Sequence, residues 1–239
     1  TSSILTTVLS WENQNVDIEE ISVEQLSTSE TNELITALSD AQQDIPPEQI
    51  EMILRESGGS PFFIDELVRY TQIDPSNIIE KPSTITLEQV ILARVGQLPT
   101  CAQNLLEVLA IAGQPLKRSV AKQAAKLENE EQTALAFLRA NHLIRTREKD
   151  KKEEIEVYHD RIRETLVDNL AREKCKNIHY QLPLALEESS HDDPESLATH
   201  FQGAGNKEKA AEYTLKAADQ ASLALAFDHA VNLYEQALA

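Results

Sequence analysis

Glycine is scarce in this chain, and that scarcity limits what the chain can fold into. Only 6 of the 239 residues are glycine, and aromatic residues make up 5%. Large β-sandwiches and barrels need many tight turns and many β-branched residues, so they are disfavoured. The abundant residues are Ala, Leu, Glu and Gln, which lose little side-chain freedom in a helix. These residue types predict a mainly helical protein. The hydrophobic share of 41% is enough for a folded core.

The net charge excludes one class of partner. The chain has 22 basic and 40 acidic side chains, a formal charge of -18. Residues 1–100 hold 17 acidic and 4 basic side chains, a balance of -13, whereas residues 101–239 hold 23 and 18, a balance of -5. Nucleic-acid binding needs a positive surface that displaces counterions from phosphate. We therefore expect no nucleic-acid partner.

Membrane and secretory segments are not expected either. No run approaches eighteen apolar residues, and no charged segment followed by an apolar one opens the chain. The two cysteines, Cys101 and Cys175, are far apart and have no metal-ligand or redox spacing. A reducing cytoplasm is the predicted location, with no membrane partner.

The apolar, β-branched run Ile4–Leu9 predicts a buried strand at the start of the chain. A strand of similar quality does not recur until residue 143, so residues 1–21 are interpreted as the end of an upstream sheet domain. Residues 22–98 then carry helix signals. Ser27 and Glu30 fit a capping box, Pro46-Pro47 opens a helix that Gly58-Gly59 ends, and Pro61 starts the next. A further helix is predicted over 86–95.

Residues 99–170 predict a winged-helix domain from the order of their elements. Three short helices precede two alternating segments, 143–147 and 154–158, which predict a β-hairpin. The six charged residues 148–153 are expected to form the hairpin loop. A closing helix is predicted over 160–170, with Asp160 as its N-cap.

Residues 171–239 predict antiparallel helix pairs, over 173–188, 194–202, 207–225 and 228–238. In the last pair, the small and aromatic residues follow the spacing of a tetratricopeptide (TPR) helix pair; they are Ala218, Ala230, Tyr234 and Ala237. One such pair cannot bury its outer face alone, so a longer repeat array is expected and both ends of the chain are predicted to be cut.

Three segments resemble the downstream half of a STAND-type, AAA+-like bacterial signalling ATPase. They are Ser57–Val68 (SGGSPFFIDELV), Leu87–Leu98 (LEQVILARVGQL) and Tyr158–Glu164 (YHDRIRE). The resemblance implies a helical lid at 22–98, a winged helix at 99–170 and truncated repeats at 171–239. The closest group is linked to a Ser/Thr protein kinase; other members carry a LuxR-type DNA-binding domain or a nucleotide cyclase.

The resemblance also implies a nucleotide site that this chain only partly contains. No G-x-x-x-x-G-K-[ST] loop is present, so ATP or ADP with Mg would be held by an upstream P-loop domain of the same protein, and no cofactor is expected in this chain alone. Gly59 and Pro61 match a G-x-P motif whose proline packs near the adenine. His159 matches a winged-helix histidine that reaches the ADP phosphate. The chain has Ser10-Trp11-Glu12 where the family often has an arginine.

Structural roles for these residues remain open alternatives. Gly59 and Pro61 would equally mark a break between helices, and His159 an ordinary histidine at a strand-to-helix turn. No catalytic residue and no metal ligand is predicted. Four further histidines lack ligand spacing and are expected on helix surfaces; they are His179, His191, His200 and His229.

The leading functional hypothesis is a regulatory fragment of a signal-transduction ATPase. It couples nucleotide state to a protein or small-molecule inducer on the repeats, with the upstream P-loop domain as its intramolecular partner. The first alternative is a scaffold that binds protein through its repeats and has no nucleotide role. The second, a DNA-binding regulator, is disfavoured because the corresponding helix opens with Asn129-Glu130-Glu131.

Overall fold

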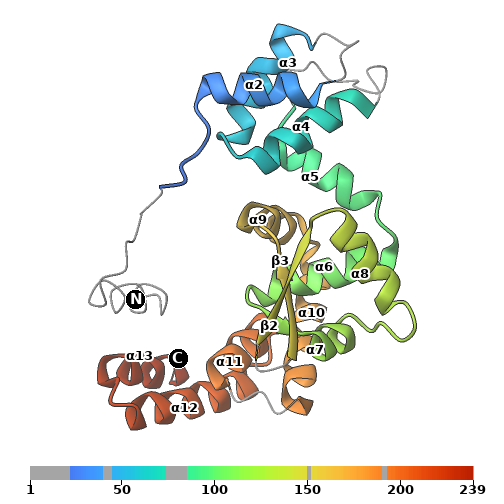
Figure 1. Ribbon diagram of the computed structural model, residues 1–239. Coiled ribbons are helices and arrows are strands. Elements are labelled where there is room, and N and C mark those ends of the chain that lie inside the picture. The colour runs from blue at the N-terminus through green and yellow to red at the C-terminus, as the bar shows by residue number, and fades with distance from the viewer. Residues whose placement is uncertain (1–21, 40–44, 74–84, 150–151, 190–192, 239) are drawn as a thin grey trace, which may run out of the picture. The chain divides into compact units, whose positions relative to one another are not determined.

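The computed structural model describes residues 22–39, 45–73, 85–149, 152–189 and 193–238. Within these ranges the protein is mainly helical, with twelve helices and one small antiparallel sheet of three strands, as the composition predicts (Figure 1). The expected strand at 4–9 lies outside the described residues. The chain forms two compact units, Thr1–Leu87 and Glu88–Ala239, which are described separately.

The first unit contains three helices that pack on one another, α2 (Thr28–Leu38), α3 (Pro47–Ser57) and α4 (Pro61–Ile73). The predicted capping box at α2 is confirmed. The Ser27 Oγ accepts from the Glu30 N–H at 3.3 Å, and the Glu30 carboxylate accepts from the Ser27 N–H at 2.8 Å. The core is formed by apolar side chains of all three helices: Ile35, Met52, Ile53, Phe63, Ile64, Leu67 and Val68.

The second unit is organised around one enclosed helix. After α5 (Leu87–Gly96), helix α6 (Thr100–Ala112) buries eight of its thirteen residues. It packs against α7 (Arg118–Ala124), α8 (Glu131–Ala140) and α9 (Asp160–Asn169). A helix that is apolar around most of its circumference must be covered on several sides, and these neighbours cover it.

The sheet of the second unit has the strand order β1-β3-β2, with antiparallel pairing throughout. Its strands are β1 (Leu116–Lys117), β2 (Ile144–Lys149) and β3 (Lys152–Val157). The sequence did not indicate β1, because two residues are too short to show a period of two.

The predicted hairpin is confirmed, but its predicted loop at 148–153 is wrong. The register continues through the pairs Glu148↔Glu153 and Lys149↔Lys152. Strand pairing depends on backbone hydrogen bonds, and charged side chains can point to solvent from an antiparallel hairpin. The charged residues therefore continue the two strands and do not form a long loop.

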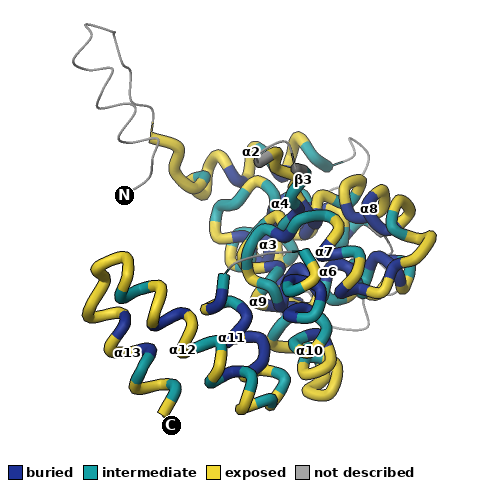
Figure 2. The backbone as a smooth tube through the Cα atoms, turned by 90° about the horizontal axis from the view of Figure 1, so that it is seen from below, coloured by how far each residue is buried: buried dark blue, intermediate teal, exposed yellow. Residues whose placement is uncertain are grey.

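Four successive helices complete the second unit, and each packs against the next (Figure 1). They are α10 (Arg172–Glu188), α11 (Pro194–Gly203), α12 (Lys207–Leu223) and α13 (Phe227–Ala237). The four helices predicted over 173–188, 194–202, 207–225 and 228–238 are confirmed, with ends that differ by at most two residues. The α12–α13 pair buries Ala217, Ala218 and Leu233, with Tyr234 packed beside them. Figure 2 shows that much of α12 and α13 is exposed.

Candidate functional site

Gly59 lies at the turn between α3 and α4, where two constraints require glycine. Its φ is +74°, and the preceding Gly58 has φ +56°. A Cβ on Gly59 would lie 2.5 Å from the carbonyl oxygen of Leu26, and the Leu26 N–H donates to the Gly59 carbonyl at 2.9 Å. The backbone before α2 therefore runs directly against this glycine.

Pro61 is the first residue of α4 and is exposed. Proline suits this position because a first-turn N–H has no partner within the helix and the ring fixes a helical φ. Gly59 and Pro61 share one turn of the first unit, whereas His159 belongs to the second.

His159 is the N-cap of α9, and this overturns the prediction that Asp160 caps the helix. The His159 Nδ1 accepts from the Arg161 N–H at 3.1 Å, and its own φ of −139° is extended. Asp160 is instead the first helical residue, where its negative carboxylate interacts favourably with the positive end of the helix dipole. Because Nδ1 accepts a hydrogen bond, the neutral imidazole carries its proton on Nε2.

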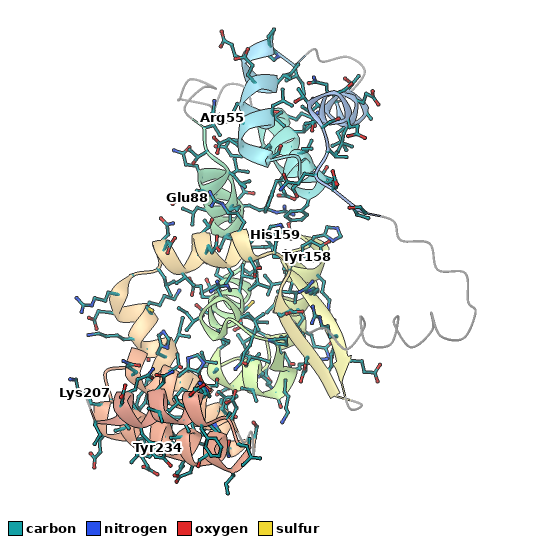
Figure 3. The ribbon with its side chains drawn as sticks, turned by 90° about the vertical axis from the view of Figure 1, so that its left-hand side faces the viewer. Arg55, Glu88, Tyr158, His159, Lys207 and Tyr234 are labelled. Atoms are coloured by element: carbon teal, nitrogen blue, oxygen red, sulfur yellow. The ribbon has the colours of Figure 1, made fainter. Side chains whose placement is uncertain are left out.

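A surface pocket of about 190 Å³ surrounds this cap. It lies where β3 ends and α9 begins, at Tyr158 and His159 (Figure 3). The rest of the lining comes from the hairpin, α6 and α9: Leu109, Gly113, Gln114, Arg145, Glu156, Val157, Asp160 and Arg163. The pocket is smaller than the roughly 300–1,000 Å³ of sites that enclose a drug-sized ligand.

The two arginines of the pocket differ in their pairing. Arg145 Nε lies 2.7 Å from Glu156 Oε1, which Arg147 also contacts at 2.6 Å. Arg163 is half-buried, and within the described ranges no carboxylate pairs with its guanidinium. Arg163 lines the same pocket as His159 and as the carboxylates of Glu156 and Asp160, so the charge of the lining is mixed. A guanidinium can bind an anionic oxygen, such as that of a phosphate group.

Arg163 was not singled out from the sequence, although a signal was present. It follows His159 by four residues, a spacing that places two side chains on the same face of a helix once the helix start is known. The expected cap at Asp160 concealed this relation, because it placed His159 one residue further from the start of the helix than the structure does.

His200 also differs from expectation, since it is 3% exposed and not on a helix surface. Its Nδ1 lies 3.1 Å from the Nδ1 of His179 across the α10–α11 interface. Burial, followed by the neighbouring His179, lowers the pKa of His200 to about 4. His229 is exposed as predicted, and its Nε2 is 3.0 Å from Glu195 Oε2. His191 lies outside the described residues.

Within the described ranges, no group of three or more His, Cys, Asp or Glu side chains could hold a metal ion. None of the helices found there is long and apolar enough to cross a membrane. No known family profile matches the chain, and no curated protein is significantly similar to it in sequence.

Proposed function

We propose that residues 99–170 form a winged-helix domain and that residues 171–239 form TPR-like helix pairs. The first assignment is supported by the order of elements, from α6 through β1, α7 and α8 to the β2–β3 hairpin. Strand β1 strengthens it, because it adds a third strand to the sheet beside β3. The second assignment is supported by consecutive helices that pack pairwise and by the buried small residues Ala218 and Ala230.

The chain then acts as the regulatory part of a STAND-like signalling ATPase, possessing a nucleotide-sensing contact but no P-loop. The observation that carries this proposal is the His159 pocket. The imidazole of His159 and the guanidinium of Arg163, for which the described residues supply no carboxylate partner, line a cavity large enough for part of a ligand. Such a partial site suits a phosphate group whose other contacts come from another domain.

The residues present fit a nucleoside diphosphate at its phosphate end. When bound, ADP supplies anionic oxygens that accept hydrogen bonds from His159 and Arg163. The main-chain N–H groups of Arg161, Ile162 and Arg163 already donate to acceptors within the protein. The phosphate would therefore be bound by side chains and not by the N–H groups at the start of α9. In this proposal, Mg and the P-loop contacts belong to the upstream domain. Nucleotide would thereby favour one arrangement of the domains over another.

The test uses protein that includes the residues encoded before Thr1. A P-loop motif is expected there, and its absence would refute the proposal. In that protein, His159→Ala is expected to weaken ADP binding about 10- to 100-fold, since a hydrogen bond to a charged group contributes ~1.5–3 kcal/mol. The matched control is His229→Ala, an exposed histidine on α13. ADP affinity that is equal in both variants would contradict the phosphate contact.

A second candidate function is a protein-binding scaffold, and the surface of the last helix pair favours it. Large apolar side chains are exposed on α12, α13 and the turn between them: Leu215, Leu223, Leu225, Phe227, Val231 and Leu238. Exposed apolar residues in a contiguous stretch mark contact surfaces. If binding of a partner protein were unaffected by nucleotide and by His159→Ala, the scaffold function would be preferred over the switch.

A DNA-binding role is disfavoured by how the basic residues near α8 are paired. Arg118 Nε lies 2.5 Å from Glu131 Oε1, and its Nη1 lies 3.0 Å from Glu153 Oε2. Arg139 also pairs with Glu153, and Lys122 lies 3.8 Å from Glu131. Carboxylates already neutralise these cations, so the surface lacks the positive field that phosphate binding requires.

A further inference from the structure

The turn between α6 and β1 borders two surface pockets of the second unit. Gly113 and Gln114 line the His159 pocket, and the same two residues line a second pocket of about 320 Å³ beside the start of α11. Gly113 is the C-cap of α6 with φ +64°, and a Cβ on it would lie 4.0 Å from the Arg163 Nη1. The turn is therefore next to the guanidinium of the proposed phosphate contact.

The side chain of Gln114 also joins two parts of the unit that lie far apart in the sequence. Its Nε2 donates to the Ser196 Oγ at 2.8 Å, across 82 positions of the chain. Ser196 belongs to the first turn of α11, where its N–H donates to the Asp193 Oδ1 at 3.3 Å. The Gln114–Ser196 bond thus connects the turn after α6 to the first turn of α11.

A second glutamine joins the same two parts of the chain but does not line the His159 pocket. Gln123, on α7, donates from its Nε2 to the Glu188 Oε2 on α10 at 2.6 Å. Gln114 and Gln123 therefore make the same kind of contact. Of the two, only Gln114 is placed where a ligand in the His159 pocket would alter its contact.

We propose that Gln114 couples the His159 pocket to α11 by exchanging hydrogen-bond acceptors. It donates to Ser196 when the pocket is empty and to a phosphate oxygen when the pocket is filled. This inference rests on the proposed phosphate contact and names how that contact is regulated. Filling the pocket thereby releases the first turn of α11 from the turn after α6.

The charge of the acceptor determines the direction of the exchange. A hydrogen bond to an ionised acceptor is roughly twice as strong as one between neutral groups. The Gln114 amide therefore prefers a phosphate oxygen to the Ser196 hydroxyl, which then bonds to water in its surface pocket. The coupling is reciprocal, so a change that frees Gln114 from Ser196 must favour the ligand.

The test measures ADP affinity by calorimetry in protein that includes the residues encoded before Thr1. Ser196→Ala removes the competing acceptor and is expected to strengthen ADP binding about two- to tenfold, the contribution of a neutral hydrogen bond. Gln114→Ala is expected to weaken ADP binding by a similar factor, because it loses the stronger of the two bonds. The matched control is Gln123→Ala, which should leave the affinity unchanged.

The opposite signs separate the exchange from a purely structural role of the bond. If the bond only held the fold together, both substitutions would shift ADP affinity in the same direction. That result would overturn the proposal, as would equal ADP affinities in Gln114→Ala and Gln123→Ala.

Hydrogen exchange at α11 gives a second readout that does not depend on affinity. The N–H groups of Ser196 and Leu197 both donate to Asp193 at the start of this helix. Saturating ADP should speed their exchange at least about twofold in the wild-type protein and not in Gln114→Ala.

The outcomes distinguish this inference from the proposed function on which it rests. If His159→Ala and His229→Ala bind ADP equally well, the phosphate contact is refuted and the exchange at Gln114 is refuted with it. If His159→Ala alone binds ADP more weakly and the exchange rates at α11 do not respond to ADP, the phosphate contact stands and only the role of Gln114 is refuted.

Discussion

Helix α6 and the α12–α13 pair belong to the same unit but are stabilised in different ways. Eight of the thirteen residues of α6 are buried, among neighbours from the sheet and from four helices. The α12–α13 pair has a small core of Ala217, Ala218 and Leu233, and it exposes Leu223 and Leu238 almost completely. Buried contacts around α6 therefore contribute most of the stability of the unit. The last helix pair has a small core of its own and depends on its contact with α11.

The largest expected effect is at the centre of the enclosed helix. Leu106 is 0% exposed, so Leu106→Ala should lower the free energy of unfolding by about 3–5 kcal/mol, through lost apolar burial and the cavity left behind. Urea denaturation followed by circular dichroism measures the change. A loss below about 1 kcal/mol would show that α6 does not control the stability of the unit.

Acidification should weaken the junction between the two regions, where His200 lies on α11. The pKa of His200 is about 4 in the folded state and 6.5 when unfolded, because burial and then His179 disfavour the charge. The unfolded state therefore binds the proton first, and stability falls as pH drops from 6.5 to about 4. From this group the loss approaches ~3 kcal/mol.

Urea midpoints at several pH values measure this loss, with His200→Gln as the comparison. The variant is expected to be less stable at pH 7 but less sensitive to pH between 6.5 and 4. Parallel pH profiles for both proteins would show that His200 is not the titrating group.

A smaller effect is expected where α11 meets α10. Gly203→Ala places a Cβ 2.5 Å from the His179 ring and should cost about 1–3 kcal/mol by overpacking. The control is Gly96→Ala, at the end of α5, where nothing lies within 4 Å of the added Cβ. Thermal melts should separate the two variants, and equal melting temperatures would contradict the close packing of Gly203 on His179.

The smallest effect belongs to the exposed surface of the last pair. Leu223 is 85% exposed, so Leu223→Ser should change the free energy of unfolding by less than about 0.5 kcal/mol. The same urea titration measures it. A loss comparable with that of Leu106→Ala would mean that Leu223 is covered in solution, for example by a partner.

Local sequence signals predicted much of the fold, because caps and breaks depend on neighbouring residues. The capping box at Ser27, the proline starts of α3 and α4, and the glycine end of α3 all follow from short-range chemistry. Strand β1 could not be predicted, since its two residues become a strand only by pairing with β3. The length of the β2–β3 hairpin likewise depends on backbone pairing between the strands, which the run of charged residues did not indicate.

The candidate site was less predictable than the fold. His159 was found by its sequence context, but Arg163 required knowledge of where α9 begins. The His179–His200 contact joins residues 21 positions apart on two helices, and neither has a metal-ligand spacing in the sequence. Contacts of this kind depend on how two helices pack together. The spacing of residues within one helix does not predict them.

The packing at Gly59 determines how sequence variation among related proteins should be interpreted. Its positive φ and its contact with the Leu26 carbonyl would preserve glycine there even if no ligand ever approached. Pro61 is exposed and has no such contact constraint beyond a favourable helix start. Conservation of Gly59 would thus indicate the path of the backbone, whereas conservation of Pro61 would be explained equally by the start of α4 and by the proposed nucleotide contact.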